Sequence, residues 1–252
     1  MITRYACALN QIPLDSLDTC IHITDLTELS PKHRIVTAAT PGNGLRLLRR
    51  TRDSLTVRVS FILHEYDTVR RRNVLQKVYA WASPGGTLTV SDRPGQQLTV
   101  ICEKLPAMSA LTWLDEMSID FTACEIPFWE ASQRTAVTTS DNALLTLPGT
   151  ADECPVSCTV VNTGDAAFTT LTLTVGDTSM TFTGLSVAAG ESFLLNVNDG
   201  CLSAKTGDTS VLLSRTDDSS DLLLACAGKE VSVSAAADQP VVATFSARGR
   251  YL

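Results

Sequence analysis

The sequence lacks the residue patterns on which most enzyme chemistry depends. Its 252 residues include only three histidines, His22, His33 and His64, and no Gly-rich phosphate loop, Gly-x-Ser-x-Gly elbow or His-Glu-x-x-His motif. A serine or cysteine nucleophile normally needs a histidine base held beside it, and these histidines are scattered through the first half of the chain. We therefore expect no enzymatic activity, no catalytic residues and no cofactor.

Export and membrane signals are also missing. The first residues, MITRYACALNQIPLDS, contain neither a continuous apolar segment nor a small-residue cleavage site. No stretch approaches the roughly 20 apolar residues that a transmembrane helix needs. We expect a protein made in a cytoplasm, with no membrane partner.

The cysteines form no pattern typical of metal sites or disulfide frameworks. Of the eight, only Cys154 and Cys158 are close in sequence, and no second close pair or nearby histidine completes a zinc site. Cys102, Cys124 and Cys158 lie in alternating apolar segments, where a free cysteine behaves as a small apolar residue. We expect free thiols and no metal ion.

Charge divides the chain into two halves. Residues 1–132 carry 14 basic and 14 acidic side chains, whereas residues 133–252 carry 6 and 13, so the net charge of −7 belongs to the second half. An acidic chain has no general attraction for nucleic acid or anionic membranes.

The first half combines strands with one helix. The segment SLTVRVSFIL alternates, with Leu55, Val57, Val59 and Phe61 on one side, as in a half-buried strand. The helix follows in DTVRRRNVLQKVYAWASPGG, capped by Asp67 and stopped by Pro-Gly-Gly. Its apolar face is expected to hold Val74, Leu75, Val78, Trp81 and Ala82, with Arg70, Arg71, Arg72 and Lys77 mostly off it. GTLTVSD and QQLTVICEKLP form a hairpin, and RYACALN, CIHITDL and GLRLLRR form shorter strands. LTWLDEMSIDFTA begins a long strand ending at Ile126, with one face made of Leu111, Trp113, Met117, Ile119, Phe121 and Ala123. These elements predict an α+β domain of antiparallel strands with one main helix.

The second half reads as an all-β sandwich. Short strands, separated by Gly, Asp and Asn turns, are expected at SCTVVN, TLTLTV, SMTFTGL, SFLLNV, SVLLSR and PVVATFSA. GDTS at 176–179 and at 207–210 predicts two similar hairpin turns. Sugar sites on sandwiches usually use exposed Trp or Tyr, yet all three tryptophans precede residue 133 and the only tyrosine after it is Tyr251. A carbohydrate-binding or adhesin module is therefore the alternative function.

The junction between the halves contains Pro127, Phe128 and Trp129, in a chain that is only 6% aromatic. Pro127 cannot donate to a strand ladder, so pairing stops there. Phe128 and Trp129 either plug the open end of the first sheet or form an interdomain seam against the sandwich.

Eight arginines lie between residues 46 and 72, against Asp53, Glu65 and Asp67. Three interpretations stay open: a solvated face, a subunit interface, or nucleic-acid binding, which the acidic chain and the absence of interleaved aromatics disfavour. The interface interpretation takes as its residues Arg46, Arg49, Arg58, Arg70, Arg71, Arg72 and Lys77.

The order of these elements resembles the distal tail proteins of long-tailed, non-contractile bacteriophages, over nearly the whole chain. The specific part is the strand SLTVRVSFIL, helix RRRNVLQKVYAWAS, hairpin GGTLTVSDRPGQQLTVICEKLP and a strand running into CEIPFWE. VVNTGDAAFTTLTLTV, LLLACAGKEVSVSA and ATFSARGRYL resemble segments of the family's C-terminal galectin-like sandwich.

The resemblance implies a structural phage or prophage tail protein that acts as a baseplate hub. Residues 1–132 would be a ring-forming domain and residues 133–252 a galectin-like β-sandwich. The implied partners are copies of itself in a homohexamer, the tail tube protein, and tail-tip, tail-associated or receptor-binding proteins. The ring would let DNA pass without binding nucleic acid specifically. The implied location is the virion tail tip, with assembly in the host cytoplasm.

Overall fold

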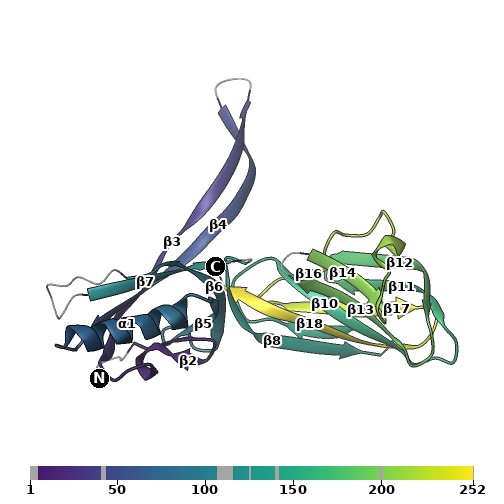
Figure 1. The fold of residues 1–252 in the computed structure, drawn as a ribbon. Helices are drawn as coiled ribbons and strands as arrows, with labels where there is room; N and C mark the ends of the chain where they lie inside the picture. The colour runs from purple at the N-terminus through teal and green to yellow at the C-terminus, as the bar shows by residue number, and fades with distance from the viewer. Residues whose placement is uncertain are drawn as a thin grey trace. The chain divides into compact units, whose positions relative to one another are not determined.

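The structure, a computed structural model, describes residues 5–40, 44–106, 116–124, 126–139, 142–198 and 201–251. The chain is mostly antiparallel β-structure and divides into two compact units, Met1–Trp129 and Glu130–Leu252 (Figure 1). No helix in the described ranges is long and apolar enough to span a bilayer.

One antiparallel sheet forms the first unit, in the order β2-β1-β5-β6-β7-β4-β3. Its elements are β1 (Cys7–Leu9), β2 (Ile12–Pro13), the short 3-10 helix η1 (Leu14–Ser16), β3 (Ile21–Thr40), β4 (Gly44–Leu63), α1 (Thr68–Ala82), β5 (Gly86–Val90), β6 (Gln96–Lys104) and β7 (Glu116–Ala123).

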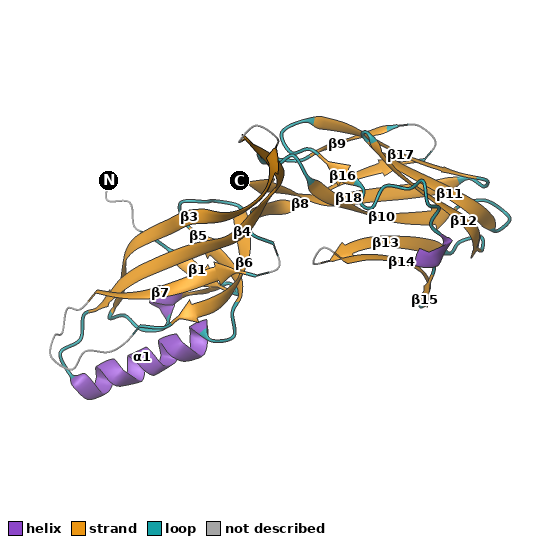
Figure 2. Cartoon of the chain, turned by 90° about the horizontal axis from the view of Figure 1, so that it is seen from above, coloured by secondary structure: helices purple, strands orange, loops and turns teal. Residues whose placement is uncertain are grey.

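Helix α1 lies along one face of this sheet (Figure 2). Asp67 caps it as predicted, since its carboxylate accepts a hydrogen bond of 2.9 Å from the Val69 amide. The apolar helix face packs on the sheet, and the Trp81 ring meets Phe121 of β7 edge to face. The buried helix residues are Arg71, Val74, Leu75, Val78, Trp81 and Ala82. The predicted apolar face is thus confirmed, but Arg71, predicted to lie off that face, belongs to it.

Strands β3 and β4 are each twenty residues long and pair with one another from end to end. The sequence predicted shorter strands at CIHITDL, GLRLLRR and SLTVRVSFIL. That prediction was wrong in length, because the residues between these segments continue the ladder instead of ending it.

The predicted hairpin is confirmed, with β5 and β6 joined through Arg93-Pro94-Gly95. In β7, Met117, Ile119 and Phe121 are buried on one face, as the alternation predicted. The strand ends at Ala123, earlier than the predicted Ile126. Two residues assigned to the same face, Leu111 and Trp113, lie outside the described residues.

Two antiparallel sheets build the second unit, in the orders β15-β14-β13-β10-β18-β8, with β16 paired to β10, and β12-β11-β17-β9. Their bounds are β8 (Trp129–Thr138), β9 (Ala143–Thr146), β10 (Cys154–Asn162), β11 (Phe168–Val175), β12 (Thr178–Val187), β13 (Ser192–Asn198), β14 (Cys201–Thr206), β15 (Thr209–Ser210), the 3-10 helix η2 (Leu212–Ser214), β16 (Leu224–Ala225), β17 (Glu230–Ala237) and β18 (Val241–Tyr251).

The inner faces of these two sheets share one core. Every second residue of β10 is buried, and Phe182 of β12 contacts Phe193 of β13 across the sheets, with ring centroids 4.9 Å apart. A buried Asn162 fixes the loop after β10, because its amide donates to the carbonyls of Ala166 and Val187, both at 2.8 Å.

Both GDTS segments form the predicted tight turns, with Gly176 and Gly207 at positive φ. The predicted strand at SVLLSR is wrong. Strand β15 covers only Thr209–Ser210, and Arg215 forms an isolated bridge with Phe182. Between them the chain turns into η2, which leaves Leu213 fully exposed while Val211 and Leu212 pack against the core.

Candidate functional site

The outer halves of β3 and β4 leave the sheet of the first unit as a two-stranded ribbon (Figure 1). Strand β7 pairs with β4 only from Thr56 to Ile62, whereas the β3–β4 ladder continues to Thr40 and Gly44. We call residues 30–40 and 44–55 the arm. Within the described residues, no third strand pairs with the arm.

Apolar side chains of the arm are exposed to solvent. The exposed fractions are 59% for Ile35, 42% for Val36 and 59% for Leu48, and Arg46 is exposed beside them. A two-stranded ribbon is marginal in water, and clustered exposed apolar side chains usually mark an interaction surface. The arm therefore has the composition of a surface that a partner covers.

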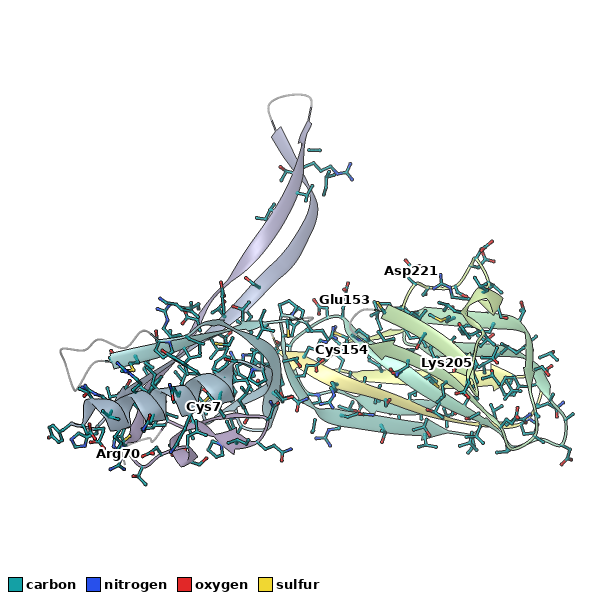
Figure 3. The ribbon with its side chains drawn as sticks, viewed as in Figure 1. Cys7, Arg70, Glu153, Cys154, Lys205 and Asp221 are labelled. Atoms are coloured by element: carbon teal, nitrogen blue, oxygen red, sulfur yellow. The ribbon has the colours of Figure 1, made fainter. Side chains whose placement is uncertain are left out.

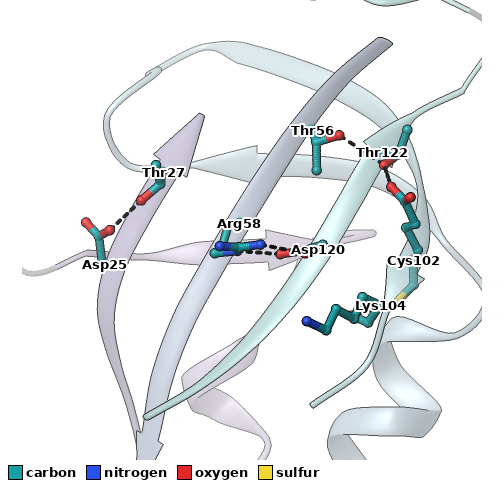
Figure 4. Close-up of polar contacts among 9 residues, drawn as sticks. Asp25, Thr27, Thr56, Arg58, Cys102, Lys104, Asp120 and Thr122 are labelled. Carbon is teal, nitrogen blue, oxygen red and sulfur yellow. Dashed lines mark hydrogen bonds and ion pairs between the residues drawn. The ribbon is translucent and has the colours of Figure 1, made fainter. Parts of the chain in front are cut away.

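The face of the sheet opposite α1 carries hydroxyl groups and one strong ion pair (Figure 4). Arg58 of β4 donates to both carboxylate oxygens of Asp120 on β7, at 2.7 and 2.9 Å. The hydrogen bond from Arg58 lowers the pKa of Asp120. Thr56 and Thr122 lie 3.2 Å apart beside this pair. Arg58 is therefore largely neutralised within its own chain.

The outer face of α1 is also paired with carboxylates of its own unit. Arg70 lies 3.1 Å from Glu65 and 3.8 Å from Asp18, and Lys77 lies 3.1 Å from Asp18. The hydrogen bond from Lys77 lowers the pKa of Asp18. Figure 3 shows Arg70 at the surface of the first unit.

The predicted interface residues thus occupy three places. Arg46 lies on the arm, as does the backbone of Arg49, whose side chain lies outside the described residues. Arg58, Arg70 and Lys77 pair with carboxylates, Arg72 is exposed, and Arg71 is buried. Their role in an interface stays a prediction.

Trp129 of the predicted junction is 1% exposed. Its indole nitrogen donates to Glu28 at 3.1 Å, and the guanidinium of Arg93 lies 5.4 Å from the centre of its ring. Pro127 and Phe128 are half-buried. Burial leaves no free indole face at Trp129 on which a ligand could stack; a seam with the second unit stays a prediction.

Sequence reasoning missed Glu28, Arg93 and the exposed apolar residues of the arm. Glu28 lies in a segment of alternating polar and apolar residues that predicts only a strand. Its partners Arg93 and Trp129 lie 65 and 101 positions further along the chain, and no local pattern connects them with Glu28. The signal for the arm was the loss of alternation in GLRLLRR, where Leu47-Leu48 and Arg49-Arg50 give a strand no single apolar face.

The described residues hold no group of three or more His, Cys, Asp and Glu side chains able to bind a metal ion. All eight cysteines are free thiols, and burial raises the pKa of Cys7 to about 12. Figure 3 shows Cys7 in the interior of the first unit. A thiol with so high a pKa is a packing residue rather than a nucleophile.

No protein-family model and no curated protein matches the sequence. The β-rich fold of the chain nevertheless has a solved structural neighbour. It is similar to the crystal structure of the Dit protein of phage SPP1, described as a paradigm of the hub adsorption apparatus in phages that infect Gram-positive bacteria. The TM-score is 0.74 at 13% identity, over 97% of this chain and 98% of that chain.

Chains of the phage P2 baseplate in its activated conformation with calcium and with strontium give TM-scores of 0.48 and 0.44, each at 7% identity. They cover 99% and 97% of this chain, and 98% and 97% of their own lengths. The similarity to the SPP1 hub protein confirms, at the level of the fold, the resemblance inferred from the sequence.

Proposed function

We propose that this chain is a structural component of a phage or prophage tail tip, a distal tail protein. Six copies form a ring that joins the tail tube to the baseplate or host-binding apparatus and lets DNA pass. The observation that carries this proposal is the similarity to the SPP1 hub protein over 97% of one chain and 98% of the other. A likeness confined to the sandwich would fit many binding modules; here the first unit and its arm are included.

The first unit has the surfaces that a closed ring needs. A head-to-tail ring requires two different, complementary surfaces on each copy. One is the arm, with Ile35, Val36, Leu48 and Arg46 exposed. The second is a sheet edge, because β3 pairs only with β4 within the described residues and leaves its other edge open. Pairing between copies would cover strand edges that otherwise promote aggregation.

We propose the second unit as the galectin-like domain that decorates the outside of the ring. Its acidic surplus, 13 acidic against 6 basic residues in 133–252, gives it a charge opposite to that of the Arg-rich region. The partners we propose are the tail tube protein and the tail-tip or receptor-binding proteins. None of these roles requires catalysis or a cofactor.

Particle mass tests this proposal. Light scattering after size exclusion, over a concentration series, should give a species near six times the chain mass of 27.0 kDa. Electron microscopy of that species should show a ring with a central hole. A monomer at every concentration, or a closed dimer without a hole, would contradict the ring.

A further inference from the structure

The root of the arm contains one of the register shifts of the β3–β4 ladder. Leu29 pairs with Thr56, and the next pair outward is Lys32 with Ser54, so two residues of β3 face the single Leu55 of β4. One of these two residues, Pro31, has no N–H group to donate. Such bulges bend a strand and interrupt its hydrogen bonds, and the direction of the arm is therefore set at this root.

Glu28 lies one ladder pair inside this bulge, next to Leu29, and its carboxylate is held from two sides. Its Oε2 atom accepts a hydrogen bond of 2.7 Å from Arg93 in the β5–β6 turn and one of 3.1 Å from the Trp129 indole. The Arg93 guanidinium lies over the Trp129 ring, 5.4 Å from its centre. One carboxylate thus joins the base of the arm, a turn of the sheet and the start of β8.

Trp129 is the residue through which the rest of the chain reaches this carboxylate. It is the last residue of the first unit and the first residue of β8, and the remainder of β8 belongs to the second unit. Its burial leaves the ring no room to move independently of its backbone. A displacement of the backbone at Trp129 consequently changes the hydrogen bond to Glu28.

We propose that Glu28 is a positioning residue that couples the direction of the arm to the position of Trp129. While both hydrogen bonds are made, the root of the arm is fixed against the β5–β6 turn. When the start of β8 shifts, the carboxylate loses the indole N–H and the bulge next to it gains freedom. The coupling is reciprocal, so holding the arm also holds Trp129. It rests on the fold of one chain and does not depend on the proposed ring.

Hydrogen exchange followed by mass spectrometry tests this coupling in the full-length chain. Glu28→Ala removes the acceptor, and Trp129→Phe removes the indole N–H while keeping an aromatic ring in the core. We expect amides of residues 28–34 and 53–57 to exchange about tenfold faster in either variant, as the loss of one hydrogen bond to a charged group implies. Amides of β5 and β6 should keep wild-type rates. Asp18→Asn is the matched control, because Asp18 also accepts a hydrogen bond from a cationic side chain, Lys77 of α1, but lies away from the root.

The double variant Glu28→Ala/Trp129→Phe separates coupling from two independent losses. If the two residues act through one hydrogen bond, the double variant exchanges at the root no faster than Glu28→Ala alone. Additive effects would overturn the proposal, as would wild-type exchange at the root in Trp129→Phe. A uniform rise over the whole first unit would also overturn it, because it would show that Glu28 only stabilises the unit. The ring is tested by mass and not by these rates, so the two proposals can fail separately.

Discussion

The arm and the sandwich of the second unit are both built from antiparallel strands, yet they differ in the burial of their apolar side chains. In β10, every second side chain is buried in a core shared by two sheets. In the arm, Ile35 and Leu48 are each 59% exposed, and no third strand pairs with the ribbon within the described residues. Strand pairing alone therefore does not create a core.

Strand β4 contains both situations within one element. Its inner half alternates, and Leu55, Val57, Val59 and Phe61 are buried. Its outer half, with Leu47-Leu48 and Arg49-Arg50, has no period of two and forms part of the arm. Within β4, period-2 alternation therefore marks the half that has a core to face, and its loss marks the half in which Leu48 is exposed.

The largest effect on stability is expected in the sandwich at Gly249, where the backbone lies in close contact with that of Pro148. A side chain at Gly249 would overlap the backbone carbonyl of Pro148, in a loop whose Thr150 and Ala151 amides both donate to the carbonyl of Arg250. Backbone atoms cannot rotate away, so Gly249→Ala should cost the second unit about 3 kcal/mol of unfolding free energy. Far-UV circular dichroism in urea measures this loss.

Gly184→Ala is the control for this first prediction. Gly184 has a positive φ of 70° but open space where a side chain would lie, so its replacement should cost about 1 kcal/mol from backbone strain alone. Equal losses of unfolding free energy in the two variants would show that the backbone beside Gly249 can move to accommodate a side chain.

An intermediate effect is expected on the polar face of the first sheet, and it depends on pH. The bond from Arg58 lowers the pKa of Asp120 from its ordinary 3.8, so the folded state favours the charged carboxylate. The stabilisation is present above the ordinary pKa and is lost as pH falls through the lowered one. Asp120→Asn should therefore lower the Tm of the first unit by a few degrees at pH 7, with the difference shrinking as the pH falls below the ordinary pKa of the carboxylate.

Tryptophan fluorescence during heating, repeated from pH 7 to pH 2, follows this difference. Asp238→Asn is the control, because the pKa of Asp238 is lowered by hydrogen bonds from Thr169 and Thr170 in the second unit. Its replacement should leave the tryptophan transition at the wild-type temperature throughout. A gap between wild type and Asp120→Asn that persists at pH 2 would assign the loss to packing rather than to the ion pair.

Local signals explain the parts of the fold that the sequence predicted correctly. The helix is marked by a capping Asp67, an apolar face and a Pro-Gly-Gly stop, and it was found at Thr68–Ala82. Pro94-Gly95 and the two GDTS segments predicted the turns for the same reason: their residues favour one backbone conformation. In these places, a few neighbouring residues decide the structure.

The errors lie where distant contacts decide. The SVLLSR segment contains no local signal for a 3-10 helix, and its Val211 and Leu212 pack against the core from the start of that helix. Arg71 follows the same i, i+3, i+4 spacing as Val74 and Leu75, yet its charge argued against burial. The contacts of Trp129 with Glu28 and Arg93 span 101 and 36 positions, and no spacing rule connects such residues.

The smallest effect on stability, and the largest on assembly, is expected in the arm. Leu48 already lies in solvent in the single chain, so Leu48→Ser should change the unfolding free energy of the first unit by no more than about 0.5 kcal/mol. If a neighbouring copy covers the arm, the same change removes buried apolar area from each contact of the ring. Light scattering should then show the six-fold species of the wild type replaced by smaller ones.

Leu213→Ser is the matched control for this last prediction, because Leu213 is at least as exposed as Leu48 but lies on η2 of the second unit. It should leave the particle mass unchanged. If both variants assemble like the wild type, the exposed apolar residues of the arm are not ring contacts. If Leu213→Ser alone disrupts assembly, the contacts lie on the sandwich. If only Leu48→Ser lowers the particle mass, the outer half of β4, which faces no core within its own chain, is covered by a neighbouring copy.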